Sequence, residues 1–131
     1  MRSVKDVEAY LEGLNRKFTA VEGQPGTFLV TTNSSMPPVA LRVDPPLVVF
    51  RVRIGDVPKN DHVQLFRKLL NLNAKALVHS SYGIDDDSIV LSAAHELENL
   101  DFNEVEATLD EMDLALTQQV PELLELSKQT K

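Results

Sequence analysis

In residues 47–54, LVVFRVRI, apolar and charged side chains alternate along the second half of one predicted strand. The even-numbered residues from Val48 to Ile54 are apolar and fall on one side of a strand, and Arg51 and Arg53 fall on the other. A strand with one apolar and one wetted side is typical of an antiparallel sheet, whose apolar face must be covered by another layer. The segment therefore directs the chain toward an antiparallel sheet with a covering layer.

Helices are the predicted covering layer. Apolar side chains recur every three or four residues in three segments, which lie at 4–16, at 61–72 and from 101 onward. The last segment carries a stripe formed by Val105, Leu109, Met112, Leu116 and Val120. We expect Pro121 to kink or end that helix, with one or two further turns in PELLEL.

Polar residues at the ends of these segments predict where the helices begin and end. Ser3 with Asp6, and Asp101 with Glu104, have the spacing of capping boxes. For the second helix we expect a cap at Asn60 or Asp61 and an end at Asn73, because asparagine tolerates the left-handed conformation.

Short strands separated by turn residues fill the remaining chain. We expect strands at 18–22, 27–32, 39–43, 47–54, 76–82 and 88–95, with Asp44-Pro45-Pro46 as one of the turns. The order is helix, strands, helix, hairpin, helix. This order predicts a single α+β domain over residues 1–131, with helices packed on an antiparallel sheet and the last few residues disordered.

Composition excludes several classes of function. The chain has no cysteine, which excludes disulfides, thiolate metal sites and cysteine nucleophiles. Acidic residues outnumber basic ones by 20 to 13, and there is no basic run, so neither nucleic acid nor an anionic membrane is an expected partner. The absence of a signal peptide or a long apolar run makes the cytoplasm the expected location.

Three consecutive aspartates, Asp85 to Asp87, raise the alternatives of a metal site and a turn. Counted as a calcium loop from Asp85, the fifth and sixth positions are Ile89 and Val90, which can neither ligate the ion nor turn the chain. Gly83 and the aspartates instead suit the tip of a hairpin. We interpret the cluster as a turn and expect no metal site.

The other candidate catalytic residues do not form a recognisable pattern. His62, His79 and His95 lack metal-ligand spacing, and in the predicted hairpin His79 lies across from residue 92 or 93 rather than from His95. The acids of the last helix, at 104, 106, 110, 111 and 113, are interpreted as a solvated face. No phosphate-binding loop or nucleophile motif occurs. We expect no catalytic residue and no cofactor, and hence no enzyme.

The second helix has more apolar surface than one contact can cover. One cluster contains Val63, Phe66 and Leu70, and a second, well separated around the helix, contains Leu65, Leu69 and Leu72. One cluster can pack on the sheet, and the other requires a second contact. Either another helix of the chain or a second copy could supply it, and the sharper prediction is a homodimer interface at Leu65, Leu69 and Leu72.

The placed elements resemble the class I type III secretion chaperones and the related YbjN family of bacterial proteins linked to sensory-transduction regulation. The best local matches are LLNLNAKAL at 69–77, YGIDDDSIVL at 82–91 and LENLDFNEVEATLDEMD at 97–113. The resemblance implies a small, acidic, non-enzymatic protein that dimerises through its second helix and holds a segment of a secreted or signalling protein.

Three functions follow as hypotheses. The first is a dimeric module that holds a non-globular segment of a partner protein. The second is a regulatory domain that binds a folded signalling partner, and the third is a domain that binds a small ligand. Because the chain is acidic, a basic or uncharged protein segment is the expected partner.

Overall fold

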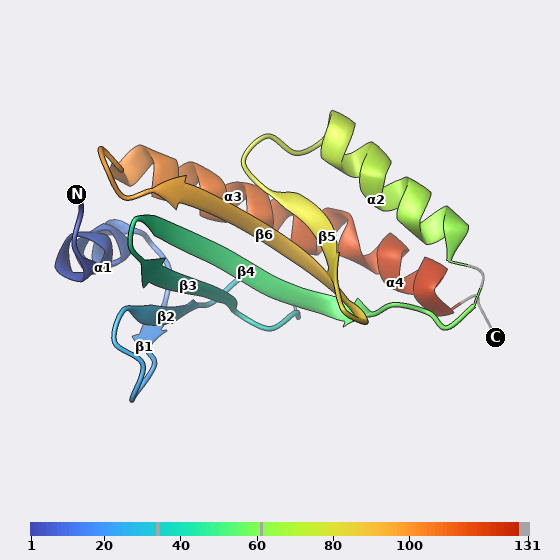
Figure 1. The fold of residues 1–131 in the computed structure, drawn as a ribbon, viewed down its shortest axis with the longest axis horizontal. Helices are drawn as coiled ribbons and strands as arrows, with labels where there is room; N and C mark the ends of the chain where they lie inside the picture. Colours follow the sequence, from blue (N-terminus) through green and yellow to red (C-terminus); the bar gives the residue numbers. More distant parts are fainter. Residues whose placement is uncertain (34, 61, 129–131) are drawn as a thin grey trace.

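A computed structural model describes residues 1–33, 35–60 and 62–128, and it confirms the predicted α+β fold (Figure 1). The sheet has the strand order β1-β2-β3-β4-β6-β5, and every neighbouring pair is antiparallel. The strands are β1 (Phe18–Ala20), β2 (Thr27–Val30), β3 (Val39–Asp44), β4 (Leu47–Asp56), β5 (Ser81–Asp85) and β6 (Ser88–Glu96). The helices are α1 (Val4–Gly13), α2 (Val63–Lys75), α3 (Phe102–Gln118) and α4 (Val120–Lys128).

Strand β4 is the central strand of the sheet, and its alternation is the one predicted. The buried residues are Val48, Phe50, Val52 and Ile54, whereas Arg51 and Arg53 are exposed. The long β4–β6 ladder places Phe50 opposite Ala93 and Val52 opposite Leu91, which adds apolar side chains to the same face. Figure 1 shows α3 and α4 along that face, behind β6 and β4 in this view. The opposite face of the sheet carries the arginines.

The predicted helix ends are confirmed at both capping boxes. The Ser3 side chain accepts from the Asp6 amide in α1, and the Asp101 side chain accepts from the Glu104 amide in α3. The apolar stripe of the last helix is buried along its whole length, from Val105 to Val120. Helix α3 ends at Gln118 and α4 begins at Val120, so Pro121 lies in a first helical turn, where its missing N–H is tolerated.

The α2–β5 region differs from the prediction. Residues 76–80 form no strand, and β5 begins only at Ser81. Helix α2 continues past Asn73 to Lys75 and is followed by Ala76 as its C-cap. Its N-cap is His62, whose side chain makes no capping bond; the predicted Asp61 cap lies outside the described residues.

No helix in the described parts of the chain combines the length and the apolar character needed to cross a bilayer.

The predicted turn at Asp44-Pro45-Pro46 is confirmed, and it joins β3 to β4 as a tight hairpin in which Asp44 pairs with Leu47.

The capping box of α3 generates a stability prediction. Replacing Asp101 with alanine leaves the Glu104 amide without its side-chain acceptor, so the free energy of unfolding should fall by about 1 kcal/mol. Urea denaturation followed by circular dichroism measures the change. Asn103→Ala, an exposed change in the same turn, is the control and should leave stability unchanged or slightly raised. Equal midpoints for Asp101→Ala and wild type would contradict the assignment.

Candidate protein-interaction surface

Helix α2 has one apolar side in the core and another in solvent. Leu65 and Leu69 are 1% and 4% exposed, because this side of the helix packs against α4 and β5. Val63 and Leu70 are each 68% exposed, and Phe66 is partly buried between the two sides. The sequence therefore predicted the two apolar clusters of α2 correctly, but the cluster that faces solvent contains Val63 and Leu70 and not Leu65 and Leu69.

The predicted interface at Leu65, Leu69 and Leu72 is corrected by this burial. Leu65 and Leu69 are covered by the chain itself, and Leu72 is half-buried against the same core. The salt bridge from Lys68 Nζ to Glu122 Oε2, at 3.1 Å, ties α2 to α4 on this side. The apolar side chains that α2 exposes to solvent are on its other side, at Val63 and Leu70.

An apolar groove of about 270 Å³ runs between α2 and β5. It is lined by Phe66, Leu69, Leu70, Asn73, Tyr82, Gly83 and Ile84. Ile84 on β5 is 44% exposed and continues the apolar surface of α2 across the groove. The groove and its rim join exposed hydrophobic side chains of α2 and β5, and apolar surface of this kind marks an interaction site. We call the exposed Val63, Leu70 and Ile84, together with the partly buried Phe66, the α2–β5 surface.

Tyr82 closes the floor of the groove. Its hydroxyl donates to Gln119 Oε1 at 2.7 Å, which links β5 to the end of α3. Burial raises the pKa of the Tyr82 hydroxyl, so the group remains a neutral donor at physiological pH. The floor of the groove therefore carries no charge at Tyr82.

Asn73 fixes the position of β5 relative to α2. Its Oδ1 accepts from the Tyr82 amide at 2.7 Å, and its Nδ2 donates to the Tyr82 carbonyl at 3.0 Å. This pair of bonds explains an asparagine within the helix, where the sequence predicted a helix end. No sequence pattern predicts this interaction, because it joins a helix and a strand that are separated by a loop.

Glu111 of α3 holds the loop before β5. One carboxylate oxygen accepts from the Val78 amide at 2.6 Å, and the other accepts from the amides of His79 and Ser80 and from the Ser80 hydroxyl. Burial alone would raise the pKa of Glu111, but these hydrogen bonds outweigh it and hold that pKa below its usual value. The carboxylate thus stays ionised and fixes the loop.

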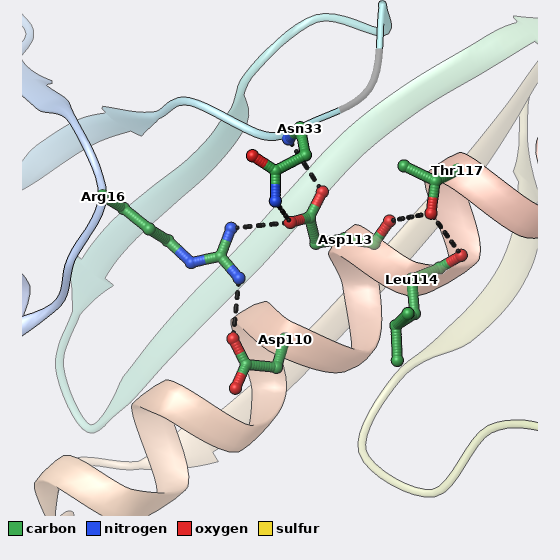
Figure 2. A network of polar contacts seen from close by, with 6 residues as sticks. All are labelled: Arg16, Asn33, Asp110, Asp113, Leu114 and Thr117. Carbon is green, nitrogen blue, oxygen red and sulfur yellow. Dashed lines mark hydrogen bonds and ion pairs between the residues drawn. The ribbon is translucent and has the colours of Figure 1, made fainter.

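A second acid of α3 is also structural rather than solvated. Asp113 is buried, and its carboxylate accepts from Arg16 Nη1 at 2.9 Å and from the side chain and backbone amide of Asn33 (Figure 2). Arg16 also bonds Asp110 at 2.7 Å. The interpretation of the α3 acids as one solvated face is therefore wrong for Glu111 and Asp113. No sequence signal marks these two residues, because their donors come from distant loops.

The turn interpretation of the aspartate cluster is confirmed. Asp85 pairs with Ser88 at the end of the β5–β6 hairpin, and Asp86 has the positive φ of 53° that the turn requires, where Gly83 had been expected. The Asp85 carboxylate accepts from Arg51 Nη2 at 2.8 Å. Among the described residues, no group of three or more potential ligands is placed to hold a metal ion.

His79 is exposed, and His62 and His95 are half-buried, but the rings of His79 and His95 lie near one another. The rings of His79 and His95 are 6.3 Å apart, because the loop held by Glu111 bends His79 away from its extrapolated strand position. Thr108 donates its hydroxyl hydrogen to the Glu104 carbonyl, so His95 Nε2 donates to Thr108 Oγ1 at 2.7 Å. This hydrogen bond to Thr108 fixes the orientation of the His95 ring.

Glu111 generates a pH-dependent stability prediction. A lowered folded-state pKa contributes stability above the unfolded value of about 4.3, and this contribution is lost as the pH falls through the folded value. Glu111→Gln should therefore be less stable than wild type by about 1–2 kcal/mol at pH 7, and the difference should shrink below about pH 4. Urea denaturation from pH 7 to pH 3 measures it, with the exposed Glu106→Gln as control. A difference independent of pH would contradict the account.

Known structures share this fold at low sequence identity. SpcU–ExoU, a heterodimeric complex from the type III secretion system of Pseudomonas aeruginosa, includes a chain that is 18% identical, with a TM-score of 0.68 and coverage of 88% of this chain and 95% of that one. YbjN from E. coli is 10% identical, with a TM-score of 0.69 and coverage of 92% and 93%. The Yersinia pestis secretion chaperone SycH, solved with a fragment of YscM2, is 18% identical, with a TM-score of 0.54 and coverage of 94% and 96%.

A match between the sequence and a protein-family model identifies the family of the chain. No curated protein sequence matches the chain. Residues 1–129 match the family model CesT_Tir_1, which describes type III secretion chaperones and spans almost all of the described structure. The predicted resemblance is confirmed, and the chain belongs to the CesT_Tir_1 family of type III secretion chaperones.

Proposed function

We propose that this protein is a bacterial, cytoplasmic, non-enzymatic chaperone that acts as a homodimer and holds a segment of a secreted partner protein. Family membership supports a protein-binding chaperone role. Two of the similar structures are complexes with a second protein: the secretion chaperone SycH with a fragment of YscM2, and the heterodimer of ExoU with SpcU. The single observation in this chain that carries the proposal is the apolar α2–β5 surface beside its groove.

The α2–β5 surface supplies the proposed contact between two copies. Val63, Phe66 and Leu70 lie at steps of three and four residues, so they share one side of α2, and Ile84 extends that side onto β5. Burial of such a side chain contributes about 1.5–3 kcal/mol when it is complete. A two-fold contact uses the same residues from both copies and so doubles the apolar area that is removed from water.

The uncovered face and the β1 edge of the sheet are the proposed site for the partner segment. On the face opposite α3 and α4, Leu47 is 38% exposed, and Leu29 and Val49 are partly exposed. Strand β1 pairs with β2 on one side only, so it can receive an extended segment on its other side. Backbone pairing there would provide affinity, and the apolar face would receive alternate side chains of the segment.

Charge narrows the expected partner. The net charge of the chain is −7, and Glu12, Glu106 and Glu125 are exposed carboxylates of its helices. A basic or uncharged segment with apolar anchors should therefore associate faster than an acidic one, and the association rate of a basic segment should fall with added salt.

A second function is favoured by one observation. The fold similarity to YbjN, at a TM-score of 0.69, is as strong as the 0.68 of the SpcU–ExoU complex, and the alternative that fits it is a regulatory domain that binds a folded partner. The two functions differ in the state of the partner. A chaperone holds a segment that is extended and protease-sensitive when free, whereas the regulator binds a domain that is folded before contact.

Leu70→Asp tests the proposed dimer. A carboxylate at the centre of the α2–β5 surface would have to be desolvated in the interface, so the dimer dissociation constant should rise by at least about tenfold. Sedimentation equilibrium measures the constant. The control is Leu114→Asp on α3, since Leu114 is also exposed, at 56%, but lies outside this surface. Equal effects of the two changes, or a monomeric wild type at high micromolar concentration, would contradict the proposal.

Co-purification from the native host tests the proposed partner. A tagged chain should retain a secreted protein whose bound segment becomes resistant to protease and lies near one end of that protein. Limited proteolysis with mass spectrometry identifies the protected segment. Recovery of a partner whose folded domain alone accounts for the binding would favour the regulatory function instead.

A further inference from the structure

The two edges of the sheet differ in whether their backbone groups are available. Strands β1 and β5 are the outer strands, and each has a neighbour on one side only. Backbone groups along an antiparallel strand point alternately toward the neighbour and toward the free edge. In β5 the amide and carbonyl of Tyr82 face the free edge, because both bond to Asn73 rather than to β6. Ile84 shares this orientation by alternation.

A side chain of α2 occupies this edge. Asn73 makes the two bonds to Tyr82 that a neighbouring strand would make, at 2.7 and 3.0 Å. Ahead of the strand, Glu111 of α3 accepts from the Ser80 amide at 2.8 Å and fixes the loop that leads into β5. The first outward-facing amide of β5 is therefore already bonded within the chain.

The remainder of the edge is short and flanked by charge. Ile84 is the next outward-facing position of β5, and the hairpin turn at Asp86 and Asp87 follows directly. Carboxylates at the end of an edge strand disfavour the approach of a second strand. The open part of the edge thus amounts to one residue beside the apolar groove.

We infer that Asn73 closes the β5 edge to strand addition, with Glu111 fixing the loop that leads into it, so that a second copy contacts this side of the molecule through side chains of α2 and the groove. Strand pairing along β5 would require the Asn73 amide to leave Tyr82. The consequence for association rests on the proposed function, whereas the closure of the edge does not. Of the two sheet edges, β1 is then the one that can pair with an extended partner segment.

Hydrogen exchange measured by NMR on the wild-type protein tests the closure itself. The Tyr82 amide, although it lies on the free edge, should be protected to within about tenfold of the Gly83 amide, which faces β6. Exchange of the Tyr82 amide at the rate of an exposed loop would overturn the inference. This result is independent of the oligomeric state, so it remains informative if the wild type is a monomer and the proposed homodimer fails.

Asn73→Ala tests the consequence for association. The Tyr82 amide should exchange at least about tenfold faster, and sedimentation velocity should show species larger than the wild-type assembly at high micromolar concentration. Asn71→Ala, an exposed asparagine on the same helix, is the matched control and should match wild type in both measurements. Asn73→Ser, whose side chain is too short to reach both Tyr82 groups, replaces the alanine variant if that variant does not fold. Retained protection of Tyr82, or lost protection without larger species, would overturn the inference.

Discussion

The burial of the apolar face of β4 is the interaction on which the rest of the structure depends. Val48, Phe50, Val52 and Ile54 lie on one side of the central strand, and β6 adds Leu91 and Ala93 to that side. Removing this much apolar surface from water requires a covering layer, which α3 and α4 supply. Because these helices occupy the middle of the face, α2 is left at its margin beside β5.

The marginal position of α2 explains why the molecule has an apolar surface in solvent. One side of the helix, with Leu65 and Leu69, completes the core, and the side with Val63 and Leu70 has no covering element among the described residues. The strongest polar networks position loops, and one of them, which contains Arg16, Asn33 and Asp110, also lines an open pocket of about 400 Å³. Arg16 and Asp113 fix the loops around α3, and Glu111 fixes the loop before β5. These contacts hold loops in place around α3 and β5, and the family of the chain supports a protein-binding chaperone role.

Local signals in the sequence were sufficient to predict most of the fold. The alternation in β4, the capping boxes at Ser3 and Asp101 and the turn at Asp86 each depend on residues within a few positions of one another. The roles of Asn73, Glu111 and Asp113 depend on segments far apart in the chain, so no local pattern marked them. The two sides of α2 were likewise indistinguishable, since each carries three apolar residues and the positions of α4 and β5 decide which is buried.

A dilution series recorded by two-dimensional amide NMR tests the central claim most directly, namely that the α2–β5 surface is where two copies meet. The account predicts concentration-dependent shifts for Val63, Phe66, Leu70 and Ile84, with a single dissociation constant, and unchanged shifts for the core residues Leu91 and Phe50. Shifts confined to another surface, such as that around Leu114, would contradict it. So would spectra that do not change with concentration from a protein that sediments as a monomer.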